Sequence, residues 1–256
     1  MVLTNGELSL SLDGALKLIS LEVGGAPINN FLCQGGGALG GVPMGFSISP
    51  REVKIEGYVC EDLEANRKLL CQICTQTPPF YIVDGDYRLE LLPKHTIEFS
   101  SLKRFSEKLL KFTIRAISPS PYWLGEAVRR QFYNCGGEST DDIAIRITNQ
   151  GDVEMGALFE FLMMSSCNFI KLIKGEERIF VNHPFKTMDK LFIDTRHGKM
   201  SVYYLPSGQS VPVNIIEFVS PDSSFFGLDV GENRFDFVVS QGLSYVTIEY
   251  SPAYLR

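Results

Sequence analysis

Phe225-Phe-Gly-Leu-Asp-Val-Gly-Glu-Asn-Arg-Phe235 is the stretch that decides the fold of this 256-residue chain. Within it, Gly231-Glu-Asn233 forms a turn-like segment directly before residues that alternate between apolar and polar side chains. Residues 246–250 alternate again, and 189–205 repeats the order of strand, glycine-containing turn and strand. Alternating runs separated by glycine turns predict antiparallel β-strands.

The same alternation extends outward over most of the chain. Leu8, Leu10 and Leu12 precede Asp13-Gly14, and Leu16, Leu18 and Leu21 follow it, a pattern typical of a β-hairpin. A second strand pair is expected over 80–92, with its turn at 84–86. Further strands are predicted at 53–59, 88–92, 111–116, 143–148, 157–163, 178–181, 191–193, 200–204, 213–218, 234–239 and 245–250.

One helix is expected, over residues 62–74, with Asp62 as its N-cap. Leu63, Leu69, Leu70, Ile73 and Cys74 make an apolar stripe, while the charged residues between them face water. Thr77-Pro78-Pro79 ends the helix, because a residue before proline avoids the helical conformation. The chain is therefore predicted to be mainly β with one α-helix.

The clearest boundary is Ser118-Pro-Ser-Pro-Tyr-Trp-Leu-Gly125, where two prolines and two serines follow a strand. We expect two domains, residues 1–125 and 126–256. The first is predicted to be β-sandwich-like with the helix, and the second a β-sandwich. Pro119, Pro121, Tyr122 and Trp123 mark the junction. A lone Trp can also stack on a sugar, but packing at the boundary is the simpler role for Trp123.

Composition excludes several functional classes. The net charge is −6, and acidic residues outnumber basic ones in each half, so no basic nucleic-acid surface is expected. The first residues lack the features of a signal peptide, and no apolar run is long enough to span a bilayer. Six scattered cysteines suit free thiols in a reducing cytoplasm better than a disulfide framework.

No motif indicates catalysis, a metal or a cofactor. Gly35-x-Gly37-x-x-Gly40 matches a dinucleotide fingerprint, but a strand-like segment follows it where a helix is required. Cys71-x-x-Cys74 lies on the apolar stripe at the end of the helix, which favours buried thiols over a redox or zinc pair. The histidines (His95, His183 and His197) are far apart in sequence. The carboxylates Asp189, Asp194, Glu217, Asp229 and Asp236 single out no glycosidase pair, and solvated turn residues are the simpler reading.

The order of these elements resembles that of siphophage distal tail (Dit) proteins, which form the hub of the phage tail tip. The resemblance rests on the closing segment with Gly231-Glu-Asn233 and on the strand at 143–148 followed by Asn149-x-Gly151-Asp152. The N-terminal order of strand, helix and strand pair, with the proline–aromatic junction, agrees with it. It covers nearly the whole chain.

This resemblance implies a virion structural protein rather than an enzyme, from a phage or prophage and made in the bacterial host cytoplasm. The N-terminal domains would close into a hexameric ring, and the C-terminal domain would be a galectin-like β-sandwich. The ring would join the major tail tube protein to the tail-associated lysin or fibre protein, contact the tape-measure protein and let DNA pass. Some members of the family anchor receptor-binding proteins, but residues 152–256 leave no room for a long arm.

The resemblance places the ring contact in residues 1–125. Phe31, Leu32, Val42, Met44 and Phe46 are apolar residues that flank the glycine-rich segment 35–41, which is unusual for a surface loop and suits a contact buried on assembly. The alternative is that they pack in their own core. Two other functions stay open, a carbohydrate-binding β-sandwich module and a glycan-processing enzyme. An aromatic strip on one sheet would favour the former, and a cleft with facing carboxylates the latter.

Overall fold

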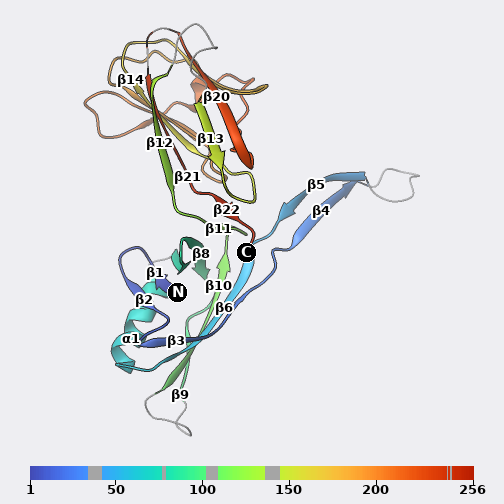
Figure 1. Ribbon diagram of the computed structural model, residues 1–256, viewed down its shortest axis with the longest axis vertical. Helices are drawn as coiled ribbons and strands as arrows, with labels where there is room; N and C mark the ends of the chain where they lie inside the picture. The colour runs from blue at the N-terminus through green and yellow to red at the C-terminus, as the bar shows by residue number, and fades with distance from the viewer. Residues whose placement is uncertain (34–41, 77–78, 102–108, 136–144, 241, 243) are drawn as a thin grey trace. The chain divides into compact units, whose positions relative to one another are not determined.

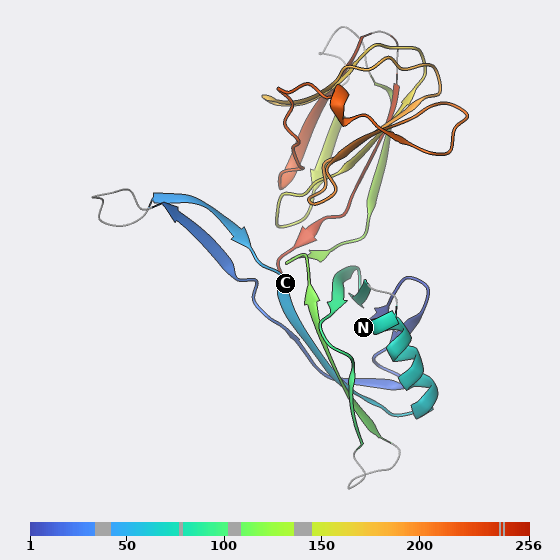
Figure 2. The ribbon, with the colours of Figure 1, turned by 180° about the vertical axis from the view of Figure 1, so that it is seen from behind.

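The computed structural model describes residues 1–33, 42–76, 79–101, 109–135, 145–240, 242 and 244–256. They form two compact units: Met1–Leu124 with Leu255–Arg256 (unit 1), and Gly125–Tyr254 (unit 2). Both consist mainly of antiparallel strands (Figures 1 and 2), which confirms the predicted mainly-β fold class. No helix in the described ranges has the length and apolarity needed to cross a membrane.

In unit 1, neighbouring hydrogen-bonded strands form a continuous series, the main strand path, in the order β2-β1-β7-β8-β10-β6-β3. Strand β9 also pairs with β10, and β11 pairs with β8. These strands are β1 (Val2–Thr4), β2 (Ser9–Ser11), β3 (Leu16–Val23), β6 (Arg51–Val59), β7 (Phe80–Asp84), β8 (Tyr87–Pro93), β9 (Glu98–Ser101), β10 (Leu110–Ser118) and β11 (Trp123–Leu124). Two further strands, β4 (Ile28–Cys33) and β5 (Val42–Ile48), form a separate hairpin.

Strand β6 shows why these residues fold this way. Every second residue, from Arg51 to Val59, is buried, and the residues between them are only partly covered or exposed. An apolar residue every two positions can face one core, because successive side chains of a strand point to opposite faces. The flanking strands β3 and β10 cover both edges of β6.

The hairpin predicted across Asp13-Gly14 is wrong in its pairing. Both runs are strands, but β2 pairs with β1 and β3 pairs with β6, and only an isolated bridge joins Asp13 to Lys17. Strand β6 is longer than β2, so β3 can form more backbone hydrogen bonds with β6 than with β2. This longer pairing outweighs the turn signal at Asp13-Gly14.

The helix is present, with different ends. Helix α1 (Leu63–Cys71) continues into a π-helical turn, η1 (Gln72–Gln76). Leu70, Ile73 and Cys74 are fully buried, as the apolar stripe predicted. Asp62 does not cap the helix: its backbone is left-handed, with φ of 39°, and its side chain makes no capping hydrogen bond.

Unit 2 is a two-layer β-sandwich. One sheet has the order β12-β21-β14-β17-β18-β19 and the other β13-β20-β15-β16. The strands of these sheets are β12 (Val128–Cys135), β13 (Ile145–Asn149), β14 (Leu158–Met163), β15 (Ile170–Lys174), β16 (Glu177–Val181), β17 (Lys190–Asp194), β18 (Ser201–Leu205), β19 (Val213–Asn214), β20 (Gly231–Val239) and β21 (Ser244–Tyr250). Unit 2 also contains the short strand β22 (Ala253–Tyr254), which belongs to neither sheet.

The core of unit 2 lies between these sheets. Phe159 and Phe161 of one sheet meet Phe235 and Phe237 of the other in edge-to-face contacts, with ring centroids 5.6 and 5.5 Å apart. Such contacts favour a fixed registration of the two layers. The strand predicted over 213–218 ends at Asn214. There the Asn214 side chain accepts a hydrogen bond from the Ile216 amide, and a 3₁₀ turn (η2, Ile216–Phe218) follows.

Candidate functional site

The β4–β5 hairpin contains the five residues expected at an oligomer interface. Phe31 pairs with Gly45 and Leu32 with Pro43, with an irregularity in register between them, while Val42, Met44 and Phe46 lie on β5. Residues 34–41, which include the glycine-rich segment, lie outside the described residues. The expected strand after that segment is present as β5. The assignment of the five residues to an interface stays a prediction.

This hairpin is separate from the rest of unit 1. Among the described strands, β4 and β5 pair only with each other. In both views the hairpin extends beyond the ends of β3 and β6, away from the main strand path of unit 1 (Figures 1 and 2). At its base, the Pro27 carbonyl accepts a hydrogen bond from the Ser49 amide at 2.8 Å, and Ile28 is 62% exposed. A projecting two-stranded ribbon with exposed apolar surface is only marginally stable by itself.

The expected junction residues lie at the end of unit 1. Ser118 and Ser120 hydrogen bond within the turn that contains Pro119 and Pro121. Trp123 is buried in β11, and the guanidinium of Arg256 lies 5.6 Å from the centroid of its ring. The boundary residues therefore belong to a packed part of unit 1.

Arg256 is held by several groups of unit 1. Its guanidinium stacks 4.3 Å from the Tyr87 ring centroid and lies 3.6 Å from the Asp84 carboxylate. Its carbonyl oxygen accepts a hydrogen bond from the buried Arg51 at 2.8 Å. The chain therefore enters unit 2 after Leu124 and comes back to unit 1 at Leu255.

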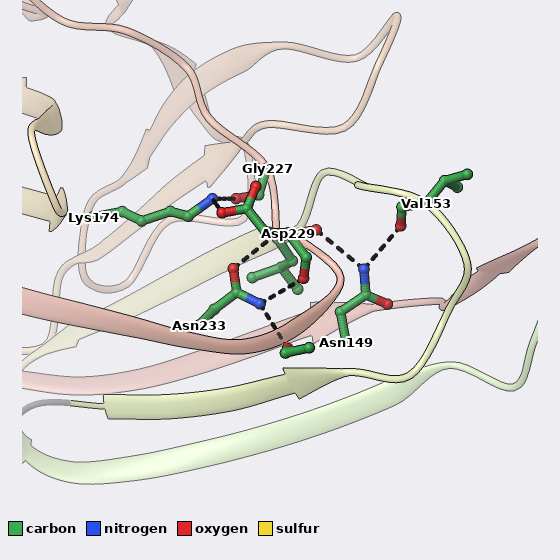
Figure 3. A network of polar contacts seen from close by, with 8 residues as sticks. Asn149, Val153, Lys174, Gly227, Asp229 and Asn233 are labelled. Carbon is green, nitrogen blue, oxygen red and sulfur yellow. Dashed lines mark hydrogen bonds and ion pairs between the residues drawn. The ribbon is translucent and has the colours of Figure 1, made fainter.

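The motif that decides the fold forms a polar network in unit 2 (Figure 3). Asn233 is 2% exposed and makes three hydrogen bonds: it donates to the Asp229 and Gly231 carbonyls and accepts from the Asp229 amide. Gly231 has φ of +92°, a conformation that favours glycine. The Gly-Glu-Asn sequence therefore builds a turn that the Asn233 side chain closes.

Two more residues connect this turn to neighbouring strands. Asn149, at the end of β13, donates to the carbonyls of Val153 and Leu228 at 2.9 and 3.1 Å. Lys174, at the end of β15, donates to the Gly227 carbonyl at 2.8 Å and pairs with Asp229 at 2.7 Å (Figure 3). The two sequence motifs singled out, around Asn149 and Asn233, thus meet at one end of the four-stranded sheet.

A second buried polar cluster was not recognised from sequence. The sequence predicts a solvated turn residue at Asp189, but Asp189 is 1% exposed. Its carboxylate accepts hydrogen bonds from the Lys186 and Ser207 amides and from the Tyr204 hydroxyl, at 2.7 to 2.8 Å. Burial alone would raise the pKa of the Asp189 carboxyl, but these donors outweigh it and the pKa is lowered. Burial and Asp189 raise the pKa of Tyr204 to about 12.

His183 packs beside this cluster. Its ring lies 4.7 to 5.0 Å from the ring centroids of Phe185, Tyr204 and Phe218. Its Nδ1 is buried without a hydrogen-bond partner among the described residues. Burial lowers the pKa of the imidazole, although the Pro184 backbone and Asp189 oppose this. The cluster packs against the sandwich core through Phe185 and Tyr204.

Several of the residues considered for chemistry have structural contacts. Burial raises the pKa of the Cys74 thiol, as expected for an inert core cysteine. Asp194, Asp229 and Asp236 form ion pairs with Arg196, Lys174 and Arg234, respectively. In the described ranges, no three His, Cys, Asp or Glu side chains come together in a way that could hold a metal.

Comparison with known proteins gives a match in sequence for unit 2. Residues 150–254 match the sequence model of the siphovirus-type tail component, C-terminal domain. The matched residues contain the Asn233 turn, and Asn149 directly precedes them; the match confirms the resemblance to distal tail proteins. No curated protein is similar enough in sequence to count as a match.

Solved structures extend the similarity in fold to nearly the whole chain. The crystal structure of the Dit protein of phage SPP1 is similar with a TM-score of 0.69 and 12% identity, covering 98% of each chain; it is described as a paradigm of the hub adsorption apparatus in phages infecting Gram-positive bacteria. A chain of the phage p2 baseplate in its activated conformation with Ca is similar at 8% identity, with a TM-score of 0.52 and coverage of 95% and 94%; the form with Sr gives 0.53. Together with the family match, these similarities support a structural role in a phage tail.

Proposed function

We propose that this protein is the hub of a siphovirus-type tail tip, in which six copies close into a ring between the tail tube and the adhesion device. Support comes from the match of residues 150–254 to the siphovirus-type tail component model and from a fold shared over nearly the whole chain with a described hub protein. The ring leaves a channel for DNA, and its lining is neutral or acidic, since a basic lumen would hold passing phosphates. The protein is a structural component without enzymatic activity, metal or cofactor.

The observation that carries the ring is the unpartnered β4–β5 hairpin of unit 1. A closed ring requires each copy to present one surface to the next copy and a different surface to the previous one. The hairpin projects from unit 1 without a described partner strand, and Ile28 at its base is exposed. We assign Phe31, Leu32, Val42, Met44 and Phe46 to the contact with the neighbouring copy.

The hub has partners on both sides of the ring. These are the major tail tube protein and tape-measure protein on one side, and the tail-associated lysin or fibre protein on the other, with receptor-binding proteins as further partners. The protein is made in the host cytoplasm and resides at the virion tail tip. Pro119, Pro121, Tyr122 and Trp123 end the ring-forming part, and unit 2 lies outside the ring contact.

Electron microscopy of the protein, alone and mixed with its tail tube protein, tests the proposal. We expect six-fold rings in at least one condition, and Met44→Asp with Phe46→Asp should abolish them while the far-UV circular dichroism spectrum stays unchanged. Val211→Asp is the matched control, because Val211 is an apolar residue of unit 2 that is 71% exposed. Absence of six-fold particles in both conditions refutes the hub. Rings that persist in the hairpin variant refute only the assigned contact.

A further inference from the structure

A cavity opens at one edge of the unit 2 sandwich. It has a volume of about 390 Å³ and lies between β12 and β13. These strands are the end strands of the two sheets, so neither has a second described neighbour on this side. The Tyr250 hydroxyl donates a hydrogen bond to the Thr148 carbonyl at 2.8 Å and thereby connects the two sheets beside the cavity. Its volume falls within the range of small-molecule sites.

Arg130 is a solvent-exposed cation at this edge, on the face of β12 that turns toward the core. It pairs in register with Ile248, a buried core residue, so its Cβ points to the same face as those of Val128 and Phe132. Among the described residues, Arg130 forms no hydrogen bond or ion pair. Its positive charge acts on Tyr250, where it opposes the rise in pKa that burial causes. The adjacent Arg129 differs, because it pairs with Glu160 at 3.3 Å.

Arg146 adds a second cation to the cavity and stands in an unfavourable position in its sheet. It lies directly opposite Arg234 in the β13–β20 pair. Like charges at directly opposite positions destabilise a sheet. Their carboxylate partners are Glu232 at 3.4 Å and Asp236 at 3.6 Å, and the Arg146–Glu232 pair is largely exposed. Local conflicts of this kind are expected where a site serves a function.

The lining has the chemistry of an oxyanion site. Arg130 and Arg146 supply two guanidinium groups, Gln150 and Thr148 supply an amide and a hydroxyl, and no carboxylate lines the cavity among the described residues. Guanidinium groups match the planar geometry of phosphate and carboxylate oxygens. Apolar atoms of Phe132 and its neighbours offer a wall for a carbon skeleton.

We propose that this cavity binds a small polyol or sugar that carries a phosphate or carboxylate group. Arg130 and Arg146 hold the anion, and Gln150 contributes a neutral donor. The anion also offsets the repulsion between Arg146 and Arg234. This inference concerns unit 2 alone and does not depend on ring formation, so it stands or falls independently of the hub.

Isothermal titration calorimetry on the full chain tests it with two anionic probes, sn-glycerol 3-phosphate and D-glucuronate, and two neutral ones, glycerol and D-glucose. We expect at least one anion to bind, more weakly at high salt, and the neutral probes not to bind. Binding of only one anion identifies which oxyanion the site takes. Arg130→Gln should weaken binding at least about tenfold, because hydrogen bonds to a charged group are lost. Arg146→Gln tests the second guanidinium separately and remains decisive if Arg130→Gln does not fold.

Arg178→Gln is the control, since Arg178 is an exposed arginine of the same sheet that pairs with Asp222 and does not line the cavity. Its affinity for the probe should equal that of the unmodified protein. The proposal is overturned if neither anion binds. It is also overturned if Arg178→Gln weakens binding as much as the cavity variants do, because the effect would then be one of overall charge.

Discussion

Replacing Asn233 with Ala tests whether the Gly-Glu-Asn turn holds unit 2 together. The side chain is almost fully buried and makes three hydrogen bonds, all between 2.8 and 3.0 Å, to the backbone of Asp229 and Gly231. A hydrogen bond contributes about 1 kcal/mol net to stability. We therefore expect the substitution to lower the free energy of unfolding of unit 2 by about 3 kcal/mol. Glu232→Ala, next in the chain, removes only an exposed ion pair and should cost less than about 1 kcal/mol.

The single Trp allows the two units to be followed separately during denaturation. Trp123 is buried in unit 1, and unit 2 contains no Trp, so fluorescence reports unit 1 while circular dichroism reports both units. In urea, Asn233→Ala should shift the unfolding transition seen by circular dichroism and leave the fluorescence transition in place. A loss below about 1 kcal/mol, or one equal to that of Glu232→Ala, would refute the reasoning from these hydrogen bonds. A shared shift of both signals would contradict independent unfolding of the units.

Four further outcomes are expected. Burial holds the pKa of His183 below its ordinary value of 6.5, so as pH falls the imidazole is protonated in the unfolded chain before it is protonated in the folded one. The free energy of unfolding should therefore fall as pH drops below about 6.5 and level off below the folded-state pKa. His183→Asn should flatten this part of the curve of stability against pH, measured by denaturation. Gly156→Ala should destabilise the protein by about 1–3 kcal/mol in urea titrations, because a Cβ there would lie 2.3 Å from the Thr195 carbonyl oxygen, while an unchanged midpoint would show that the backbone yields. On an array of neutral glycans unit 2 should give no reproducible hit. A hit abolished by Tyr203→Ala would favour the carbohydrate-binding alternative, and Tyr203 is the suitable probe because Tyr204 holds Asp189. Residues 1–125 and 126–256, expressed separately, should both be soluble, and a circular dichroism spectrum of an unfolded chain for 126–256 would contradict the proposed domain split.

Alternation predicted most of the strands because most strands here bury one face. In β6, β10, β14 and β21 the apolar residues recur with a period of two, and the structure places strands at the expected positions. Strand β15 was missed, although Ile170 and Leu172 alternate with lysine; its turn at Gly175 was the available signal. Tertiary pairing of β3 with β6 could not be read from the Asp13-Gly14 turn.

The failure of the sequence pattern to predict strand β12 has a more specific cause. Its core-facing positions are Val128, Arg130 and Phe132, and the arginine interrupts the apolar alternation on which the sequence reading depends. An arginine is tolerated there because β12 is an edge strand beside a cavity. Asp189 was misread for a related reason, since its donors come from residues 186, 204 and 207, and the distant pair is recognisable only once β17 and β18 are aligned.

Because Leu255–Arg256 belong to unit 1 but follow unit 2 in the chain, they affect when unit 1 can complete its packing during synthesis. All but two residues of unit 1 have been synthesised once residue 124 is added. Arg256, which stacks on Tyr87 and Trp123 and accepts a hydrogen bond from Arg51, is translated only after the whole of unit 2. A polypeptide that terminates anywhere within unit 2 therefore lacks these contacts as well. Arg256 thus makes the final packing of the first unit depend on complete synthesis of the second, so truncated products carry a defect in both.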